Sequence, residues 1–513
     1  MMTTASTPRD PHTDRRGWQA FAVVLPFLLL FWVDMWHHTM FFDEVNAWAI
    51  SAASPTLAKM FYYVHFEGHP WLWYFILWFP SRLTHDPVAM KWVEAALGTA
   101  IILIVGLLSP FTWKQRALIL SSYFLVWEYT VMCRMYSVML LLVLLYVVRR
   151  VSRPAGVIGC CVLLGFAGNT DMTGVLLTSA LLLEYTYSGW LRLPAAERKA
   201  TWKRWAAGWA AYIALIALAV GTLWPSKQIS WQSSGHLGAD ALSRHRITSS
   251  IVDMVVGPWW PIAPDFPHRF WRTTVIDSRW LYVLVPVVLF AYWRICRKKK
   301  SLALLMTATL LFGALFADVV YPGSPRHWGI AFISLLIGLW VESSQAAAAP
   351  HGKAAWSRWT YALFGVSALA GLCALAGSWR HPLSNAREAA KWVETNEPNE
   401  VITGMPDVSF ASLAEEMQRR VYFPECDCMD TFKLFSRYRE DMPESKIPFA
   451  INRAMNSLGR SELLFSFYRP FSVDELARLK AAGLNAQPVA SFLGADMKTD
   501  NFVIYRVTRI NNA

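Results

Sequence analysis

Two adjacent carboxylates, Asp43 and Glu44, follow the first long apolar run of the chain, within the stretch FFDEVNAWAI at residues 41–50. Ionisable side chains at the edge of a membrane are costly, and they mark functional sites by default. A carboxylate placed there could act as a general base that removes a proton from an attacking hydroxyl group. Adjacent helical residues do not share a face, so Glu44 can instead point away and cap the following helix.

An unperturbed aspartate has a pKa of about 3.9, which is too low for an efficient base. We expect the pKa of Asp43 to be higher than this, because burial and the like charge of Glu44 would both raise it. The same loop ends in HFEGHPW, which adds His65, Glu67 and His69. These three are candidates for substrate binding or for a divalent metal, although their spacing matches no established ligand pattern. The alternative for each is simple solvation at the membrane interface.

The elements that must position these side chains are transmembrane helices. The chain has 513 residues, of which 55% are hydrophobic and only 16% charged, whereas soluble domains carry roughly 25% charged residues. Long uncharged runs recur, which predicts a polytopic α-helical membrane protein with about 11–13 transmembrane helices over residues 1–378. The expected spans lie near 18–35, 70–84, 90–110, 117–130, a fifth that ends at 148, 155–168, 173–188, 205–223, 279–293, 301–318, 328–342 and 358–378. Some are short enough to be broken or re-entrant.

The loop at 36–69 has structure of its own in this prediction. Pro55 after Ser54 indicates a helix start. Apolar residues then follow at helical spacing, namely Leu57, Met60, Phe61 and Val64. This pattern is typical of an amphipathic helix that lies in the membrane interface.

Lysine and arginine are distributed unevenly between the connecting loops. Basic connectors at 149–153, 198–204 and 297–300 alternate with loops that carry few positive charges. The positive-inside rule makes these connectors cytoplasmic, so loops 36–69 and 224–278 and the C-terminal segment are external. The first apolar run has no small-residue cleavage site, which favours a retained span with a cytoplasmic N-terminus. We predict a multi-pass protein of the bacterial inner (plasma) membrane, with its C-terminal domain in the periplasm.

Residues 379–513 are soluble in character. Strand patterns occur in EVITGMP, RVYFP, ELLFSFYRP and NFVIYRVTR, and helix patterns in SNAREAAKWVE, VSFASLAEEMQ and SVDELARLKAAG. Asn385 with Glu388, and Ser472 with Glu475, have the spacing of capping boxes. We therefore predict a small α/β domain, and it has no glycine-rich phosphate-binding fingerprint.

The cysteines and the net charge exclude other classes. The seven cysteines have no zinc-finger spacing, and Cys426 and Cys428 are expected to be two free thiols or a local disulfide. The net charge of +12 reports membrane topology, because no basic, aromatic-interleaved soluble domain is present. We expect no nucleic-acid partner.

Four short motifs occur in an order known from one family. FFDEVNAWAI matches an acidic motif after the first span, and GHPWLWYF resembles an HPP-L-Y element, with Trp71 in place of the second proline. EYTVMCRMY, from Glu128 to Tyr136, resembles an E-Y-x-V-x-x-R-x-Y element, and SPRHWG resembles a P-R-Y element, with His327 in place of the aromatic residue. The chain thus resembles the GT-C class of membrane glycosyltransferases, in particular the family of protein O-mannosyltransferases and the lipid A aminoarabinose transferase.

The resemblance implies a donor sugar linked to polyprenyl phosphate and an inverting transfer to an acceptor hydroxyl group. Asp43 and Glu44 are the implied catalytic carboxylates. The phosphate leaving group needs fixed positive charge, preferably from arginine. The candidates for donor phosphate binding are Arg326, His327, Arg134, Lys227 and Arg244, and those for substrate binding are His65, Glu67, His69, Glu128 and Tyr136. Arg134 can alternatively anchor a lipid headgroup. No cofactor is required, and a divalent metal, if bound, would use His65, Glu67 and His69.

Competing functions remain open at this point. One is an oligosaccharide or polysaccharide ligase that uses a lipid-pyrophosphate glycan. Another is a transporter or flippase for a glycolipid, although transporters usually contain internal repeats, which this chain lacks. A third is a scaffold whose C-terminal domain binds a partner. The expected partners are the lipid bilayer, a polyprenyl-phosphate-linked donor, and a glycan, lipid or protein acceptor.

Overall fold

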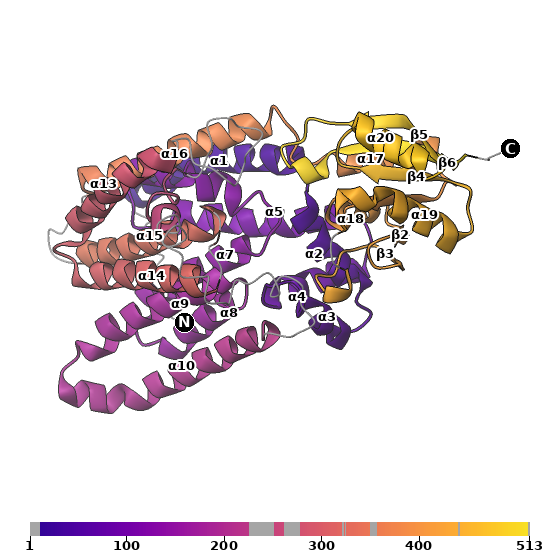
Figure 1. Cartoon of the computed structure of the whole chain (residues 1–513). Helices are drawn as coiled ribbons and strands as arrows, with labels where there is room; N and C mark the ends of the chain where they lie inside the picture. Colours follow the sequence, from indigo (N-terminus) through magenta and orange to yellow (C-terminus); the bar gives the residue numbers. More distant parts are fainter. Residues whose placement is uncertain are drawn as a thin grey trace, which may run out of the picture.

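The structure is a computed structural model that describes residues 11–224, 251–260, 278–320, 323, 325–348, 356–439 and 442–510. A bundle of helices forms one end of the molecule, and a sheet domain built from the C-terminal part of the chain forms the other (Figure 1). This arrangement confirms the predicted fold class, a helical membrane protein with a C-terminal α/β domain.

The membrane part consists of helices of unequal length. Their bounds are α1 Pro11–His37, α2 Phe42–Ala53, α3 Leu57–Val64, α4 Leu72–Trp78, α5 Val88–Leu103, α6 Trp113–Leu120, α7 Tyr136–Ser152, α8 Val157–Ala167, α9 Met172–Thr186, α10 Ala195–Thr222, α13 Ser278–Cys296, α14 Lys300–Val319, α15 Pro325–Ala348 and α16 Arg358–Ser378. Among the described residues, five helical stretches of at least 18 residues are apolar enough to span a membrane. The first, Val88–Leu108, combines α5 with the π-helical turn that follows it, and the other four lie in α10, α14, α15 and α16. The helical part of residues 24–53 would make a sixth, as a pair bent by 77°.

Within the described residues this count is below the predicted 11–13, because α7, α8 and α9 have fewer than 18 residues and two other expected spans are interrupted. The expected span at 70–84 is the short helix α4, which ends before a turn begins at Pro80. The expected span at 117–130 breaks after α6, where the hydroxyls of Ser121 and Ser122 donate to the helix carbonyls of Ala117 and Ile119. Such side-chain bonds compete with helix formation and bend the chain.

The predicted external loop at 36–69 is mostly helical. The stretch that holds Asp43 is α2, a helix that the sequence suggested only through the possible capping role of Glu44 and gave no bounds. The predicted amphipathic helix is present as α3, but it starts at Leu57 with Thr56 as its cap rather than Ser54. Met60 and Val64 are fully buried, and α3 packs against α2 and α4. The apolar face of α3 is therefore covered by protein.

The C-terminal domain is a six-stranded sheet in the order β3-β2-β1-β4-β6-β5. Its strands are β1 Ile402–Met405, β2 Val421–Phe423, β3 Cys428–Asp430, β4 Glu462–Phe467, β5 Leu484–Phe492 and β6 Phe502–Arg509, and its helices are α17 Ala386–Asn396, α18 Asp407–Glu416, α19 Ile447–Leu458 and α20 Val473–Ala481. Strands β2, β1 and β4 are parallel neighbours, and the outer pairings are antiparallel.

All four predicted strands and all three predicted helices of this domain are present, whereas β3, β5 and α19 were missed. The capping box of Ser472 and Glu475 is confirmed at the start of α20. The predicted box of Asn385 and Glu388 is wrong, because the Asn385 side chain makes no capping bond. The Ser384 hydroxyl instead accepts from the Ala386 amide at this end of α17.

The two parts of the molecule interlock around α2. Helix α2 packs against α18, and Phe42 belongs to the hydrophobic core of the sheet domain. In return, Phe432 of the sheet domain belongs to the core of the helical bundle. Helix α2 lies beside the sheet domain (Figure 1), so we assign α1 to the membrane span and α2 to the junction outside it.

Candidate active site at the junction

A pocket of about 160 Å³ lies where α2, the N-terminal ends of α4, α7 and α15, and the sheet domain meet. Its walls are Phe42, Asp43, Asn46, Ala47, Glu67, His69, Trp73, Tyr74, Arg134, Met135, Arg326 and Phe435. It therefore combines two carboxylates, two guanidiniums and an imidazole with aromatic walls. Small-molecule sites typically have such an apolar lining with a few convergent polar groups.

The centre of this pocket is a carboxylate held by two arginines. Arg134 Nη1 donates to Asp43 Oδ2, and Arg326 Nη2 donates to the same oxygen at 3.1 Å. The Asp43 side chain is 31% exposed, against 4% for Arg134 and 15% for Arg326. Along the chain, Asp43 lies 91 residues from Arg134 and 283 residues from Arg326, so only the tertiary fold brings the three together.

The expected increase in the pKa of Asp43 is wrong. Burial alone would raise this pKa, but the guanidiniums of Arg134 and Arg326 outweigh burial and lower it to about 2. Glu44 does not add a like charge in the pocket, since its side chain leaves α2 on another face. Asp43 is thus an ionised acceptor of hydrogen bonds and a weak base.

A second row of hydrogen bonds supports Arg134. Its Nη2 lies 3.3 Å from Nε2 of His69, and Nδ1 of His69 lies 3.1 Å from Oδ2 of Asp171. Because a guanidinium can only donate, Nε2 of His69 accepts and Nδ1 carries the proton. Asp171 also caps α9 by accepting from the Thr173 amide at 2.8 Å. The position of Arg134 is thereby tied to the start of α9.

Glu67 is the pocket carboxylate that is suited to proton transfer. Burial raises its pKa to about 8, and the Asn46 side-chain amide donates to its Oε2 at 3.1 Å. The ideal pKa of a general acid or base lies close to the working pH. Glu67 meets that condition and Asp43 does not.

Glu44 lies outside the pocket and is completely buried. Its carboxylate accepts from the Phe41 amide at 3.0 Å, which is the capping interaction considered from the sequence. It also contacts His38 Nε2 at 2.8 Å and accepts from the Cys133 amide at 2.6 Å. Asp43 and Glu44 therefore belong to two different sites.

The proposed metal group of His65, Glu67 and His69 does not form in the described part of the chain. His65 Nδ1 contacts the Thr222 carbonyl at 3.2 Å, far along the chain from the pocket lining. His69 uses both ring nitrogens on Arg134 and Asp171. The His/Cys/Asp/Glu cluster with metal-binding geometry found in the described residues is a different one, formed by His38, Glu44 and Cys133.

The other predicted substrate residues lie behind the pocket wall. Tyr136 stacks on Tyr129 at 5.0 Å between ring centroids, and it meets the His327 ring edge-on. Glu128 is buried and accepts from the Tyr123 hydroxyl at 2.7 Å. Lys227 and Arg244 lie outside the described residues.

Sequence interpretation missed the pocket residues Asn46, Trp73, Tyr74 and Phe435, and it missed Asp171, which holds His69 from behind the pocket wall. Asn46 could have been found once α2 was identified as a helix, because it lies three residues after Asp43 and so shares its face. Trp73 and Tyr74 lie within the GHPWLWYF motif. No local signal connects Phe435 to this site.

No protein-family model matches the chain, and no curated protein matches it significantly. Among solved structures, the fold is similar to the crystal structure of ArnT from Cupriavidus metallidurans bound to undecaprenyl phosphate. The match has a TM-score of 0.47 and 12% sequence identity, and it covers 96% of this chain and 98% of that chain. ArnT is an aminoarabinose transferase, so the match falls in the family that the sequence motifs resemble.

Proposed function

We propose that this protein is an inverting glycosyltransferase of the inner membrane. In this proposal it moves a sugar from a polyprenyl-phosphate-linked donor to an acceptor hydroxyl group on the periplasmic face. The observation that carries the proposal is the convergence of Arg134 and Arg326 on one carboxylate in a pocket at the junction. Arginine binds phosphate through paired, charge-assisted hydrogen bonds.

Asp43 would prepare the two guanidiniums for the donor. Its single negative charge offsets one of their two positive charges, and its hydrogen bonds fix the direction of both guanidiniums. A lipid phosphate that enters would take over one or both guanidiniums, and it would gain two donors that are already oriented. Preorganised donors of this kind stabilise the charge that develops on a leaving group.

The proton balance of the transfer assigns a role to Glu67. The acceptor oxygen attacks the anomeric carbon, and the bond between that carbon and the phosphate oxygen breaks on the opposite side. The phosphate leaves with the electron pair towards Arg134 and Arg326. The hydroxyl proton passes to Glu67, whose pKa of about 8 favours accepting it, whereas the pKa of Asp43 is about 2. This assignment replaces Asp43 as base and keeps it as a positioning residue.

Two observations support the external location. The basic connectors fit the cytoplasmic side. Cys426 and Cys428 form a disulfide in the sheet domain, and disulfides persist in oxidising compartments such as the bacterial periplasm. The four cysteines buried in the helical part, Cys133, Cys160, Cys161 and Cys296, are free.

The test uses the purified full-length protein in nanodiscs, with a panel of undecaprenyl-phosphate sugars, a lipid-pyrophosphate glycan, and a parallel series in EDTA. Wild type should consume at least one phosphate-linked donor. Asp43→Asn, Glu67→Gln and Arg326→Ala should be strongly impaired, while Arg358→Ala, an exposed arginine at the start of α16, should remain active. Consumption of the pyrophosphate glycan alone would favour the ligase, and inertness towards every donor would refute transferase activity.

A further inference from the structure

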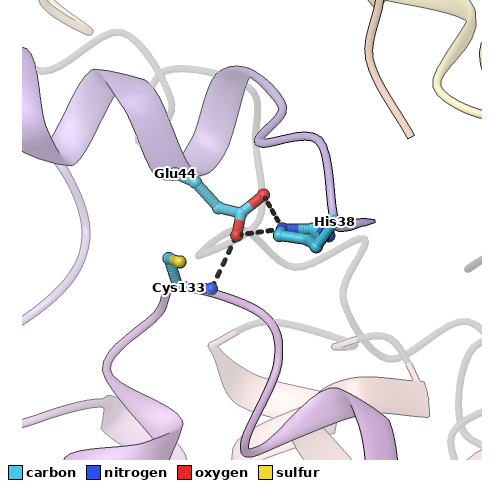
Figure 2. A group of neighbouring side chains, drawn as sticks. All are labelled: His38, Glu44 and Cys133. Atoms are coloured by element: carbon cyan, nitrogen blue, oxygen red, sulfur yellow. Dashed lines mark hydrogen bonds and ion pairs between the residues drawn. The ribbon is translucent and has the colours of Figure 1, made fainter. Parts of the chain in front are cut away.

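Three buried side chains meet on the face of α2 that is turned away from the pocket. They are His38 in the turn after α1, Glu44 in the first turn of α2, and Cys133 in the segment before α7. Each is at most 3% exposed. Their candidate ligand atoms all lie within 4.8 Å of one another, and Figure 2 shows the His38 ring and the Glu44 carboxylate converging beside Cys133.

We propose that His38, Glu44 and Cys133 form a binding site for one transition-metal ion, with Zn²⁺ as the expected occupant. Imidazole nitrogen, carboxylate oxygen and thiolate sulfur are the three ligand types that zinc uses in proteins. A thiolate in the set disfavours Mg²⁺ and Ca²⁺, which prefer oxygen ligands. This site is separate from the pocket and does not depend on the proposed transferase activity.

The carboxylate of this site is oriented by the backbone. Glu44 Oε2 accepts from the Phe41 amide at 3.0 Å, and Oε1 accepts from the Cys133 amide at 2.6 Å. Both amides hold the carboxylate in its position whether or not a metal is bound. The Cys133 thiol, by contrast, has only a weak contact of 3.9 Å to the Val131 carbonyl. Its sulfur is thus available to a stronger partner.

A carboxylate that can orient the His38 ring lies across a small cavity from it. His38 Nδ1 is buried without a hydrogen-bond partner, and so is Oδ1 of Asp496, a residue of the sheet domain that is 5% exposed. Both residues line one cavity of about 10 Å³ at the junction, which is room for a single water molecule. With Nε2 on the metal, Nδ1 would donate to that water and the water to Asp496. Metal-bound histidines are usually oriented through such links to a carboxylate.

Ionisable side chains lie close to His38, Glu44 and Cys133. The Lys91 ammonium donates to the His38 carbonyl and interacts electrostatically with both Cys133 and Glu44. The Lys91 ammonium repels a cation. The buried Glu94 carboxyl also interacts electrostatically with Cys133 and Glu44.

A metal at this site would also affect the pocket, because two of its ligands are next to pocket residues in the sequence. Glu44 follows Asp43, and Cys133 precedes Arg134. A metal that joins Glu44 to Cys133 would fix the distance between the two backbone segments that carry the ion pair of the pocket. The role of the metal would then be to position Asp43 and Arg134.

The first experiment measures metal content by plasma mass spectrometry on the full-length protein purified in detergent without chelator. About one zinc per chain is expected for wild type. Cys133→Ser and His38→Ala should lose it, and Cys160→Ser, another buried free cysteine, should keep it. Less than a tenth of an equivalent in wild type, or a content that Cys133→Ser leaves unchanged, would overturn the proposal.

A second measurement leaves His38, Glu44 and Cys133 unchanged, so its outcome does not depend on whether variants of these residues fold. Wild type loaded with Co²⁺ should develop a thiolate-to-cobalt charge-transfer band, and zinc should displace it. Asp496→Asn should weaken Co²⁺ binding by about 10–100-fold, the usual effect of losing an outer partner of a metal-bound histidine. Absence of the thiolate band in wild type would rule out Cys133 as a ligand. Both readouts are independent of sugar transfer, so they distinguish failure of this site from failure of the proposed function.

Discussion

At the scale of single residues, the adjacent carboxylates Asp43 and Glu44 have different surroundings. Asp43 faces the pocket, where two guanidiniums keep it ionised. Glu44 faces backbone amides and His38 in a dry interior. Glu67 is different again, because burial raises its pKa to about 8 and outweighs the opposing charge of Arg134. Environment rather than residue type thus separates the proposed positioning carboxylate, the proposed metal ligand and the proposed proton acceptor.

The first prediction concerns Glu67→Gln. A base must be deprotonated to act, so kcat/KM of wild type should rise with pH and level off above about 8, the pKa of Glu67. Glu67→Gln should lower kcat/KM by about 10²–10⁴-fold and remove this rise. Glu388→Gln, an exposed glutamate on α17, is the control. A variant that keeps the wild-type pH profile would return the role of base to Asp43.

The second prediction tests phosphate recognition by Arg326. Arg326→Lys keeps the positive charge but loses the planar pair of donors, which lysine cannot replace. One hydrogen bond to a charged group is worth about 1.5–3 kcal/mol, so the KM for the donor should rise about 10–100-fold. Steady-state kinetics against donor concentration measure this effect, with Arg358→Lys as control. An unchanged KM would mean that Arg326 does not contact the donor.

At the scale of elements, breaks in the helices create the site. The helical path stops after Glu128, and residues 129–135 run without regular helix before α7 begins. This irregular segment presents both the Cys133 amide and the Arg134 side chain to α2. The surrounding protein encloses this irregular backbone, since Tyr129, Val131 and Cys133 are fully buried.

The third prediction concerns the close approach of α15 to this segment at Gly329. A Cβ atom at Gly329 would lie 2.3 Å from the Tyr129 hydroxyl and 2.5 Å from the Phe124 ring. The Tyr129 hydroxyl donates to the Arg326 carbonyl at 2.6 Å, so its displacement would disturb the start of α15. Gly329→Ala should lower stability by about 1–3 kcal/mol and raise the KM for the donor.

Thermal melting in detergent and donor kinetics measure these two effects. The matched control is Gly365→Ala in α16, where an added Cβ would meet nothing within 4 Å. If both glycine variants behave like wild type, the contact between α15 and Tyr129 does not set the position of Arg326.

At the scale of the whole molecule, the sheet domain completes the pocket. Phe435 forms part of its wall and packs edge-on against Phe42 at 6.2 Å. The Lys433 amide donates to Asn46 Oδ1 at 3.0 Å, while Asn46 Nδ2 donates to Glu67. A single amide side chain therefore joins the sheet domain to the proposed proton acceptor.

The fourth prediction is that Asn46→Ala uncouples the two parts. The buried Lys433 amide and the Glu67 carboxylate would each lose a partner, at a cost of about 1–3 kcal/mol for each buried group. We expect a fall in kcat/KM of at least about tenfold, together with faster proteolysis of the segment around Lys433. Asn396→Ala on α17 serves as the control, since its side chain is exposed. Full activity with wild-type proteolysis would show that this link has no functional role.

Composition and local patterns were enough to predict the class of the protein and seven elements of its sheet domain, although not β3, β5 and α19. Hydrophobic runs and charge asymmetry act locally, so the membrane character followed from composition, and alternating patterns located β1, β2, β4 and β6. The sequence also singled out Asp43, because acidic residues beside apolar runs are rare, and the motif resemblance added Arg134 and Arg326. Span lengths were less predictable, since breaks such as the one after α6 depend on local side-chain bonds rather than on hydropathy.

Which of the candidate site residues contact one another depends on the tertiary structure. Arg326 contacts Asp43 although the two lie 283 residues apart along the chain. Phe435 of the sheet domain lines the same pocket. The pKa values of Asp43 and Glu67 diverge because one has guanidinium partners and the other has none of comparable strength. The separation of Glu44 from the pocket, and its meeting with His38 and Cys133, depend on the bend between α1 and α2. Such contacts join residues far apart in the chain, and no local pattern encodes them.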